Sequence, residues 1–159
     1  HLLFARSAAI CAVRFDAKSL KTIGEAIPIV EDLYWSLTNG LAGFDVSDNG
    51  TLVYVRGSEA NVTRQVVWSD RSGRITPAFP EPGSWSEPRV SPDGRWIALT
   101  RTDPDQQVWL YDNARRVLSQ FTRYTDGVAF GPVWTPDSRA LIFAREVPQY
   151  DIHRQRIDA

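Results

Sequence analysis

The residues whose types and spacing could support chemistry are two carboxylates that each follow a hydroxyl side chain. Ser91 precedes Asp93, and 44 residues later Thr135 precedes Asp137. Carboxylate and hydroxyl oxygens can bind a cation such as Ca²⁺, but such a site needs several oxygens that converge on one point. The same residues are typical of tight turns, because Asp accepts hydrogen bonds from nearby backbone amides and a hydroxyl caps the turn. We therefore predict a structural role for both pairs and no metal site.

Nucleophilic and acid–base catalysis find little support in the sequence. His1 and His153 are the only histidines, and the single cysteine, Cys11, lies in an apolar run that predicts a buried side chain. His153 occupies a strand position, which favours a packing role. No Gly-x-Ser-x-Gly motif with later Asp and His partners is present. The sequence thus predicts no catalytic residue, no cofactor and no enzymatic activity.

A turn followed by an apolar run recurs along the chain at a fixed spacing. Ser47, Ser91 and Thr135 each open such a turn, and 44 residues separate each of them from the next. The turns are Ser47-Asp48-Asn49-Gly50, Ser91-Pro92-Asp93-Gly94 and Thr135-Pro136-Asp137-Ser138, followed by apolar runs at 52–55, 96–99 and 140–143. A period of this size, with a turn and a strand at the same place in each copy, is typical of a repeat architecture.

The apolar runs themselves indicate which repeat architecture is present. Leu52–Val55 and Leu141–Phe143 are apolar at consecutive positions, whereas a sandwich strand with one wet face would alternate. Consecutive apolar residues indicate burial on both faces, as in a small sheet stacked between two others. Pro and Gly interrupt the chain too often for helices. The sequence predicts an all-β fold, a partial β-propeller of four-stranded antiparallel blades with a 44-residue repeat.

The chain is predicted to be a single domain that begins and ends inside a blade. Residues 2–6 nearly match residues 141–145, so both belong to the same position of the unit. Ala26–Val30 is predicted as an outer strand, since Pro28 is tolerated at a sheet edge. The predicted units are an incomplete blade at 1–40, complete blades at 41–84 and 85–128, and an incomplete blade at 129–159, with three, four, four and three strands.

Carboxylates on the inner strands could form an acidic ring at the mouth of a propeller channel. Asp45 and Glu87 lie on successive inner strands of the predicted blades, but Gly131 and Val133 stand at the equivalent positions of the next blade. The ring of acids is therefore not sustained, which again favours a non-catalytic module.

Charge and hydropathy exclude two classes of partner. Lys and Arg number 18 against 19 Asp and Glu, which gives a formal net charge of -1. Nucleic acid and anionic membranes both require a clustered basic excess. No apolar run approaches the ~20 residues of a membrane-spanning helix. We expect neither nucleic-acid binding nor membrane insertion by this stretch.

One unit contains the segments Glu87–Ala98, Val108–Asp112 and Leu118–Thr122. Together these three segments resemble the repeat of TolB-like β-propellers, a WD-like unit of many bacterial proteins. Gly131–Asp137 opens a second match, while Asp48-Asn49 stands where the family prefers Pro-Asp. The resemblance implies a six-bladed ring, which requires more strands than the fourteen predicted here. We therefore expect an open, curved fragment of such a ring, with the remaining blades in the parent polypeptide.

The opening of the chain contains the segments Leu3–Ala5, Val13–Asp16 and Gly24–Pro28. These segments are similar to the propeller that follows the kinase domain in some bacterial serine/threonine kinases. This resemblance implies an extracytoplasmic or periplasmic location.

The predicted function is a non-catalytic module that binds protein or peptide, as a scaffold or sensor of a larger bacterial protein. The alternative is the propeller of an enzyme such as a prolyl-oligopeptidase-like hydrolase, whose catalytic domain would lie outside this stretch.

The two sides of the predicted blades differ in sequence. One side carries short regular turns, whereas the other carries the loops between second and third strands and the connectors to the next blade, which vary between units. Loops whose sequence differs between units, although the blade geometry does not require it, are where binding sites for partners can form. The variable segments are Gly57–Thr63, Arg101–Gln106, Arg145–Gln149, Pro80–Trp85 and Arg123–Ala129.

Aromatic and arginine side chains on the variable side are the predicted anchors for a protein or peptide partner. Trp85, Arg101, Tyr124 and Tyr150 are these candidates, because such side chains gain most free energy when an interface covers them. Trp85 and Tyr150 have an alternative interpretation, in which they cover blade edges. Both interpretations stay open at the level of sequence.

Overall fold

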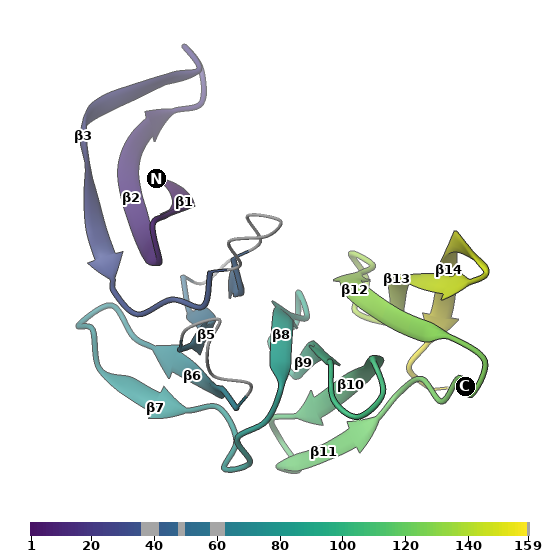
Figure 1. The fold of residues 1–159 in the computed structure, drawn as a ribbon. Helices are drawn as coiled ribbons and strands as arrows, with labels where there is room; N and C mark the ends of the chain where they lie inside the picture. Colours follow the sequence, from purple (N-terminus) through teal and green to yellow (C-terminus); the bar gives the residue numbers. More distant parts are fainter. Residues whose placement is uncertain (36–41, 48–49, 58–62, 159) are drawn as a thin grey trace.

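The computed structural model describes residues 1–35, 42–47, 50–57 and 63–158. These residues form fourteen β-strands and no helix (Figure 1). The described residues therefore contain no helix that could span a membrane. The strands are β1 (Leu2–Arg6), β2 (Ala9–Asp16), β3 (Lys21–Val30), β4 (Phe44–Val46), β5 (Leu52–Arg56), β6 (Gln65–Ser69), β7 (Ile75–Pro77), β8 (Trp85–Val90), β9 (Trp96–Arg101), β10 (Gln107–Asp112), β11 (Val117–Gln120), β12 (Val128–Trp134), β13 (Ala140–Val147) and β14 (Gln149–Arg156).

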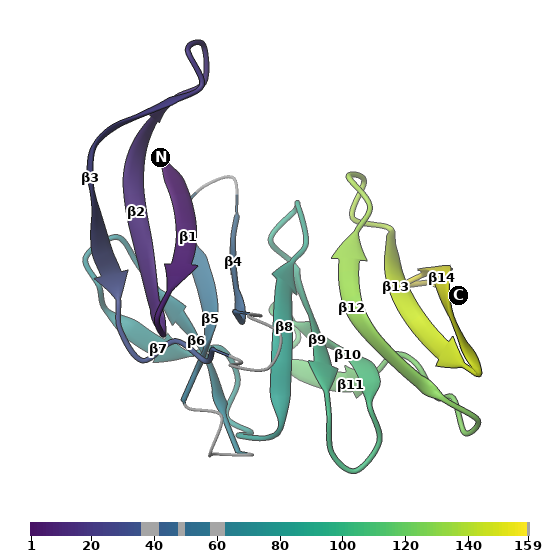
Figure 2. The same ribbon diagram turned by 45° about the horizontal axis from the view of Figure 1, so that its top comes forward.

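The strands build four antiparallel sheets that follow one another along an open arc (Figures 1 and 2). The sheets have the orders β1-β2-β3, β4-β5-β6-β7, β8-β9-β10-β11 and β12-β13-β14. We call them the first, second, third and fourth blade. Strands β4, β8 and β12 contact one another in succession and line the inner side of the arc. The all-β fold and the partial propeller predicted from the sequence are confirmed.

Burial on both faces is confirmed for the second strands of the two middle blades, β5 and β9, but the prediction is wrong for β13, where Ile142 is 36% exposed because no described blade covers that face. Val53, Tyr54 and Val55 in β5 are all fully buried, as are Ile97, Ala98 and Leu99 in β9. A strand can bury consecutive side chains only when other layers cover both of its faces. Each of these two strands is therefore packed between two neighbouring blades.

The hydrophobic core consists of three layers, one between each pair of successive blades. Val53 and Val55 pack with Ile97 and Leu99 between the second and third blades. Ala98 packs with Leu141 and Phe143 between the third and fourth blades. The remaining layer joins the first and second blades through Ile10, Val30, Leu33, Leu52, Tyr54 and Val67.

The repeat is less regular than its 44-residue spacing suggests. The amide of Ser47 donates to the carbonyl of Thr51, whereas the amide of Ser91 donates to the carbonyl of Trp96, both at 2.9 Å. The loop of the second blade is thus one residue shorter, and β5 and β9 are equivalent at a spacing of 45. A shift of one residue along a strand moves each side chain to the opposite face. Tyr54 is therefore equivalent to Leu99, and both side chains face the preceding blade. A spacing of 44 would have made Tyr54 equivalent to Ala98, which faces the following blade.

The hydroxyl–carboxylate pairs hold the turns between the first and second strands of the third and fourth blades. The Ser91 hydroxyl donates to Asp93 Oδ1 at 2.5 Å and accepts from the Trp96 amide at 2.9 Å. Thr135 and Asp137 repeat the pattern, with a hydroxyl–carboxylate distance of 2.6 Å. Each carboxylate is committed to its own turn, in agreement with the structural role predicted for them. The equivalent residues Asp48 and Asn49 lie outside the described residues.

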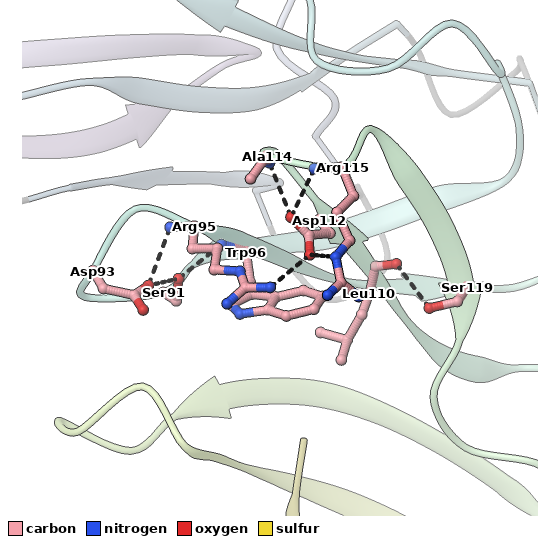
Figure 3. A network of polar contacts seen from close by, with 9 residues as sticks. All are labelled: Ser91, Asp93, Arg95, Trp96, Leu110, Asp112, Ala114, Arg115 and Ser119. Atoms are coloured by element: carbon pink, nitrogen blue, oxygen red, sulfur yellow. Dashed lines mark hydrogen bonds and ion pairs between the residues drawn. The ribbon is translucent and has the colours of Figure 1, made fainter. Parts of the chain in front are cut away.

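Asp112 fastens the two short turns of the third blade to each other (Figure 3). Its Oδ1 accepts from the amides of Ala114 at 2.9 Å and Arg115 at 3.1 Å, and its Oδ2 accepts from the Arg95 guanidinium at 3.0 Å. Burial alone would raise the pKa of this carboxyl group, but the hydrogen bonds from Arg95 and the two amides outweigh burial and lower the pKa. The ionised form of Asp112 is thus the form that stabilises the blade.

Asp112→Asn is expected to lower the melting temperature at neutral pH by several degrees. Because the folded-state pKa is depressed, the stabilising contribution is complete above the unfolded value of about 3.9 and is lost as the pH falls through the folded-state pKa. The difference in melting temperature between wild type and variant should therefore narrow as the pH falls below the unfolded value of about 3.9. Thermal scans by circular dichroism at several pH values measure this difference. Asp105→Asn, at an exposed loop position, is the control and should melt at the same temperature as the wild type. A difference between Asp112→Asn and wild type that does not change with pH would contradict the role of the charge.

Candidate functional site

The variable loops and connectors meet on one side of the arc, which we call the loop face. It comprises the β5–β6, β9–β10 and β13–β14 loops and the connectors between blades. The amide of Thr102 in the β9–β10 loop donates to the carbonyl of Ser84 in the β7–β8 connector at 3.0 Å. The amide of Ala129 donates to the carbonyl of Gln106 at 2.8 Å. Backbone hydrogen bonds therefore join the β9–β10 loop to the β7–β8 connector on one side and to the start of β12 on the other. Within the predicted segment Gly57–Thr63, residues 58–62 lie outside the described residues.

A buried glutamine fixes the connector between the third and fourth blades. The Gln107 side-chain amide donates to the carbonyls of Tyr124 at 3.0 Å and Gly127 at 3.3 Å. Its Oε1 accepts from the hydroxyl of Thr122 at 2.7 Å. Gln107 is 1% exposed, so these bonds are shielded from water. The loop face is consequently preorganised around Tyr124, which lowers the entropic cost of binding there.

Trp85 belongs to the core and not to the exposed surface. Its side chain is 2% exposed, and its ring packs edge-on against Phe79 and Trp109 at centroid distances of 5.5 and 5.9 Å. The indole N–H donates to the carbonyl of Glu81 at 3.1 Å. The prediction that Trp85 is an exposed anchor is therefore wrong. Trp85 covers the junction of the second and third blades, which is the alternative that the sequence left open.

Arg101 lies on the loop face with its guanidinium over two indole rings. The distances from its Cζ to the ring centroids are 5.6 Å for Trp85 and 5.3 Å for Trp109. Its Nε is buried without a hydrogen-bond acceptor. Among the residues that the structure describes, the side chain of Arg101 forms no hydrogen bond and no ion pair. The side chain is half-buried, stacked in place and without a polar partner.

Tyr124 is half-buried at the junction of the third and fourth blades. The Arg145 guanidinium lies 4.1 Å above the Tyr124 ring and forms an ion pair of 2.8 Å with Asp126. His153 stacks on Phe143 with an interplanar angle of 18°, as the packing role predicted for it requires. Gln107 lies opposite Arg101 in the β9–β10 ladder and bonds to the Tyr124 carbonyl, so it links the two candidate anchors.

Tyr150 is 70% exposed and lies apart from the other candidates. It occupies β14 on the face of the fourth blade that points away from the third blade. Its ring packs edge-on against Phe130 at 6.0 Å, and the negative charge of Glu146 raises the pKa of its hydroxyl. Ile142 and Ile152 share this face and are 36% and 70% exposed. Tyr150 thus contributes to an open sheet face more than to the loop face.

The inner-strand carboxylates clamp neighbouring blades together. Glu87 Oε2 accepts from the Gly131 amide of the fourth blade at 2.9 Å and from the Thr100 hydroxyl at 2.7 Å. Asp45 Oδ2 accepts from the Val90 amide of the third blade at 3.0 Å, and burial raises the pKa of Asp45. Within the described parts of the chain, no three His, Cys, Asp or Glu side chains gather as metal ligands. The two acids serve the contact between blades.

The opposite side of the arc carries a cleft between the second and third blades. Its volume is about 800 Å³, and its lining combines residues of the short turns, including Ser47, Gly94 and Asn113, with residues 78–81 of the β7–β8 connector. Trp68 and Tyr111 contribute aromatic rings and Arg116 an exposed charge to its lining. This cleft is the competing site against which any assignment to the loop face must be tested.

The sequence analysis did not single out Arg64. This residue is 9% exposed, its Nη1 donates to the carbonyl of Trp85 at 3.4 Å, and its guanidinium lies 3.8 Å from the centroid of the Tyr34 ring. Its Nε, like that of Arg101, is buried without an acceptor. In the sequence, Arg64 is only an arginine directly before a predicted strand, and this position does not indicate a functional role unless the fold is known.

Solved structures with a similar fold are propeller proteins. No protein-family profile and no curated protein matches the sequence. TolB from Acinetobacter baumannii is 15% identical with a TM-score of 0.69, over 96% of this chain and 39% of that chain. A putative TolB from Agrobacterium tumefaciens is 18% identical with a TM-score of 0.62, over 95% of this chain and 58% of that chain. A chain of the nidogen/laminin complex is 15% identical with a TM-score of 0.70, over 98% of this chain and 57% of that chain.

These similarities establish a β-propeller fold for the chain. At identities of 15–18% they carry no statement about activity or ligands. The chain spans less than two thirds of the length of each of these proteins.

Proposed function

We propose that this chain is a non-catalytic propeller module that binds a protein or peptide on its loop face, within a larger protein whose further blades extend it to a six-bladed ring. The observation that carries the proposal is the loop face itself. Its loops differ between blades in sequence, yet backbone and Gln107 hydrogen bonds hold them in place, and Arg101 and Tyr124 are presented on this frame. Rigid aromatic and arginine groups are the side chains that contribute most to protein interfaces.

The non-catalytic part of the proposal rests on the surroundings of the titratable groups. His153 stacks on Phe143, lies 6.3 Å from the Tyr124 ring centroid and lies 3.7 Å from the exposed Asp151. None of these three neighbours is a serine, threonine or cysteine. Cys11 is buried. The purified chain should therefore turn over no generic peptide, ester or glycoside substrate. Turnover that a point change within this chain abolishes would overturn this part.

The parent protein is, in this proposal, a bacterial receptor-like kinase that uses the propeller as an extracytoplasmic scaffold or sensor. The support is the similarity of residues 3–5, 13–16 and 24–28 to the propellers that follow such kinase domains. The coding sequence on either side of this stretch tests the assignment, because a kinase domain upstream agrees with it and a hydrolase domain contradicts it.

Peptides selected from a displayed random library against the chain should bind through the loop face. Arg101→Ala and Tyr124→Ala should each raise the dissociation constant of the selected peptides by about tenfold or more, because both remove interface anchors. Fluorescence polarisation measures the affinity. Melting curves separate lost binding from lost folding, with Arg101→Ala expected to leave the melting temperature nearly unchanged.

Arg116→Ala is the matched control for this experiment. Arg116 is an exposed arginine at the cleft on the short-turn side, so its loss should leave the affinity for the selected peptides unchanged. If Arg116→Ala abolishes binding while Arg101→Ala and Tyr124→Ala preserve it, the partner occupies the cleft and the loop-face proposal fails.

A further inference from the structure

We propose that Arg101 binds a carboxylate from an acidic side chain of the partner protein. This inference deepens the proposed function, on which it rests, by naming the chemistry of the group that the loop face recognises. It starts from a comparison of three arginines that occupy the same place in successive blades. Arg56, Arg101 and Arg145 all lie near the end of the second strand of the blade, where the loop face begins.

The three arginines are equivalent in register and not only in type. Arg56 pairs with Leu33, and Arg101 pairs with Trp85. Arg145 pairs with Ala129 in the same manner. Leu33 lies in the connector that enters the second blade, whereas Trp85 and Ala129 lie at the start of β8 and β12, directly after the connectors that enter the third and fourth blades. The connector therefore lies beside the guanidinium in every case, and an acid in the connector can reach it.

In two of the blades the connector supplies that acid. Arg56 forms an ion pair with Asp32, which directly precedes Leu33 in the connector from the first blade. Arg145 forms an ion pair with Asp126 at 2.8 Å, in the connector from the third blade. The arginine at this position of the repeat thus binds a carboxylate in two blades. A guanidinium suits this role because it presents several donors that match carboxylate oxygens.

The third blade keeps the arginine and lacks the acid beside it. Ser84 directly precedes Trp85, where Asp32 precedes Leu33, and Pro82 stands 19 residues before Arg101, as Asp126 stands 19 residues before Arg145. No described carboxylate, including those of Glu81, Asp103 and Asp105, forms an ion pair with Arg101. The guanidinium is held over Trp85 and Trp109 with its donors free for a group from outside the chain.

Arg64 adds a second positive charge at the same junction. It contacts the Trp85 backbone through Nη1, while Arg101 contacts the Trp85 ring. Neither arginine has a described carboxylate partner. Two partly buried guanidinium groups near one tryptophan attract an anion more strongly than an exposed pair would, because water screens them less. A carboxylate is favoured over a phosphate because the equivalent arginines of this chain take carboxylates.

Nuclear magnetic resonance of the arginine Nε–Hε groups tests the inference on the whole chain. The probe is acetyl-Gly-Glu-Gly-Glu-Gly-amide, and the matched control peptide replaces both Glu by Gln. The Arg101 signal, assigned through Arg101→Lys, should shift in a saturable manner with the Glu peptide and not with the Gln peptide. Arg145 is the internal control: its Nε, like that of Arg101, is buried without an acceptor, but its Nη2 is already paired with Asp126, so its signal should shift little. Arg101→Gln should weaken binding of the Glu peptide by about tenfold or more.

Three results would overturn the inference. They are an equal response of Arg101 to the Glu and Gln peptides, an equal response of Arg145 and Arg101 to the Glu peptide, and saturation by inorganic phosphate at lower concentration than by the Glu peptide. The outcome is separable from that of the proposed function. If the Glu peptide binds at Arg101 while library-selected peptides bind at the short-turn cleft, the carboxylate site stands and the loop-face function fails. Selected peptides that depend on Tyr124 but require no acidic residue would give the reverse result.

Discussion

Trp85→Ala is expected to lower the free energy of unfolding by about 3–5 kcal/mol. The side chain is 2% exposed and fills the space between the second and third blades. Its removal leaves a cavity between two hydrogen-bonded sheets, which cannot collapse as a flexible surface could. The carbonyl of Glu81 also loses its indole donor.

Urea denaturation followed by circular dichroism measures this loss as a decrease in the transition midpoint at constant slope. Tyr150→Ala is the control, because it also removes a large aromatic side chain but from a site that is 70% exposed. We expect its effect to be within about 0.5 kcal/mol, as for most surface substitutions. Equal losses for both variants would contradict the assignment of Trp85 to the core between blades.

Glu87→Ala is expected to lower the free energy of unfolding by about 1–3 kcal/mol, because it removes the acceptor of two hydrogen bonds at once. The Gly131 amide and the Thr100 hydroxyl both donate to Glu87 Oε2. Thr100 is fully buried, so its hydroxyl cannot turn to water instead. Since Gly131 belongs to the fourth blade, the change weakens the attachment of that blade to the third.

Hydrogen exchange locates this effect as well as measuring it. Amides of β12 and β13 should exchange faster in Glu87→Ala, while those of β5 and β6 should keep their protection, because the second blade does not contact Glu87 through these bonds. Glu87→Gln retains an oxygen acceptor and should recover most of the lost stability. Uniform acceleration of exchange in all four blades would argue against a clamp between the third and fourth blades.

These clamps bear on the candidate site as well as on stability. The strand that begins at Trp85 carries Glu87 on the inner side of the arc, and the same strand supports Arg101 through the Trp85 ring. A partner that binds at the junction of the second and third blades thus contacts a region fixed by both core packing and the inner-strand hydrogen bonds. Binding there is expected to cost little conformational entropy.

The sequence alone determined the architecture of this protein, because the signals for it are local. Ser91, Asp93 and Gly94 specify a turn through their own backbone preferences and short-range hydrogen bonds. The consecutive apolar residues of β5 and β9 specify burial on both faces whichever residues cover them. Repetition of these two signals was sufficient to predict stacked antiparallel sheets, fourteen strands and a partial propeller.

The register of the second blade was decided only by the tertiary structure. The shorter loop between Ser47 and Thr51 changes the equivalence of β5 by one residue, and every residue of the run 52–55 is apolar, so the pattern could not reveal which face each side chain takes. An alternating strand would have shown the shift, because its polar residues would have moved into the core.

The candidate site depended still more on the tertiary structure. Whether Trp85 points inward is decided by the path of the β7–β8 connector, which no periodic pattern specifies. Whether Arg101 has an acidic partner depends on which residues another segment brings beside it: Asp32 reaches Arg56 across 24 residues, and Asp126 reaches Arg145 across 19. Local preferences determine turns and strands, but pairing between distant charged groups is decided by the assembled blades. The sequence could therefore select Arg101 as a candidate, and only the fold distinguishes it from Arg56 and Arg145.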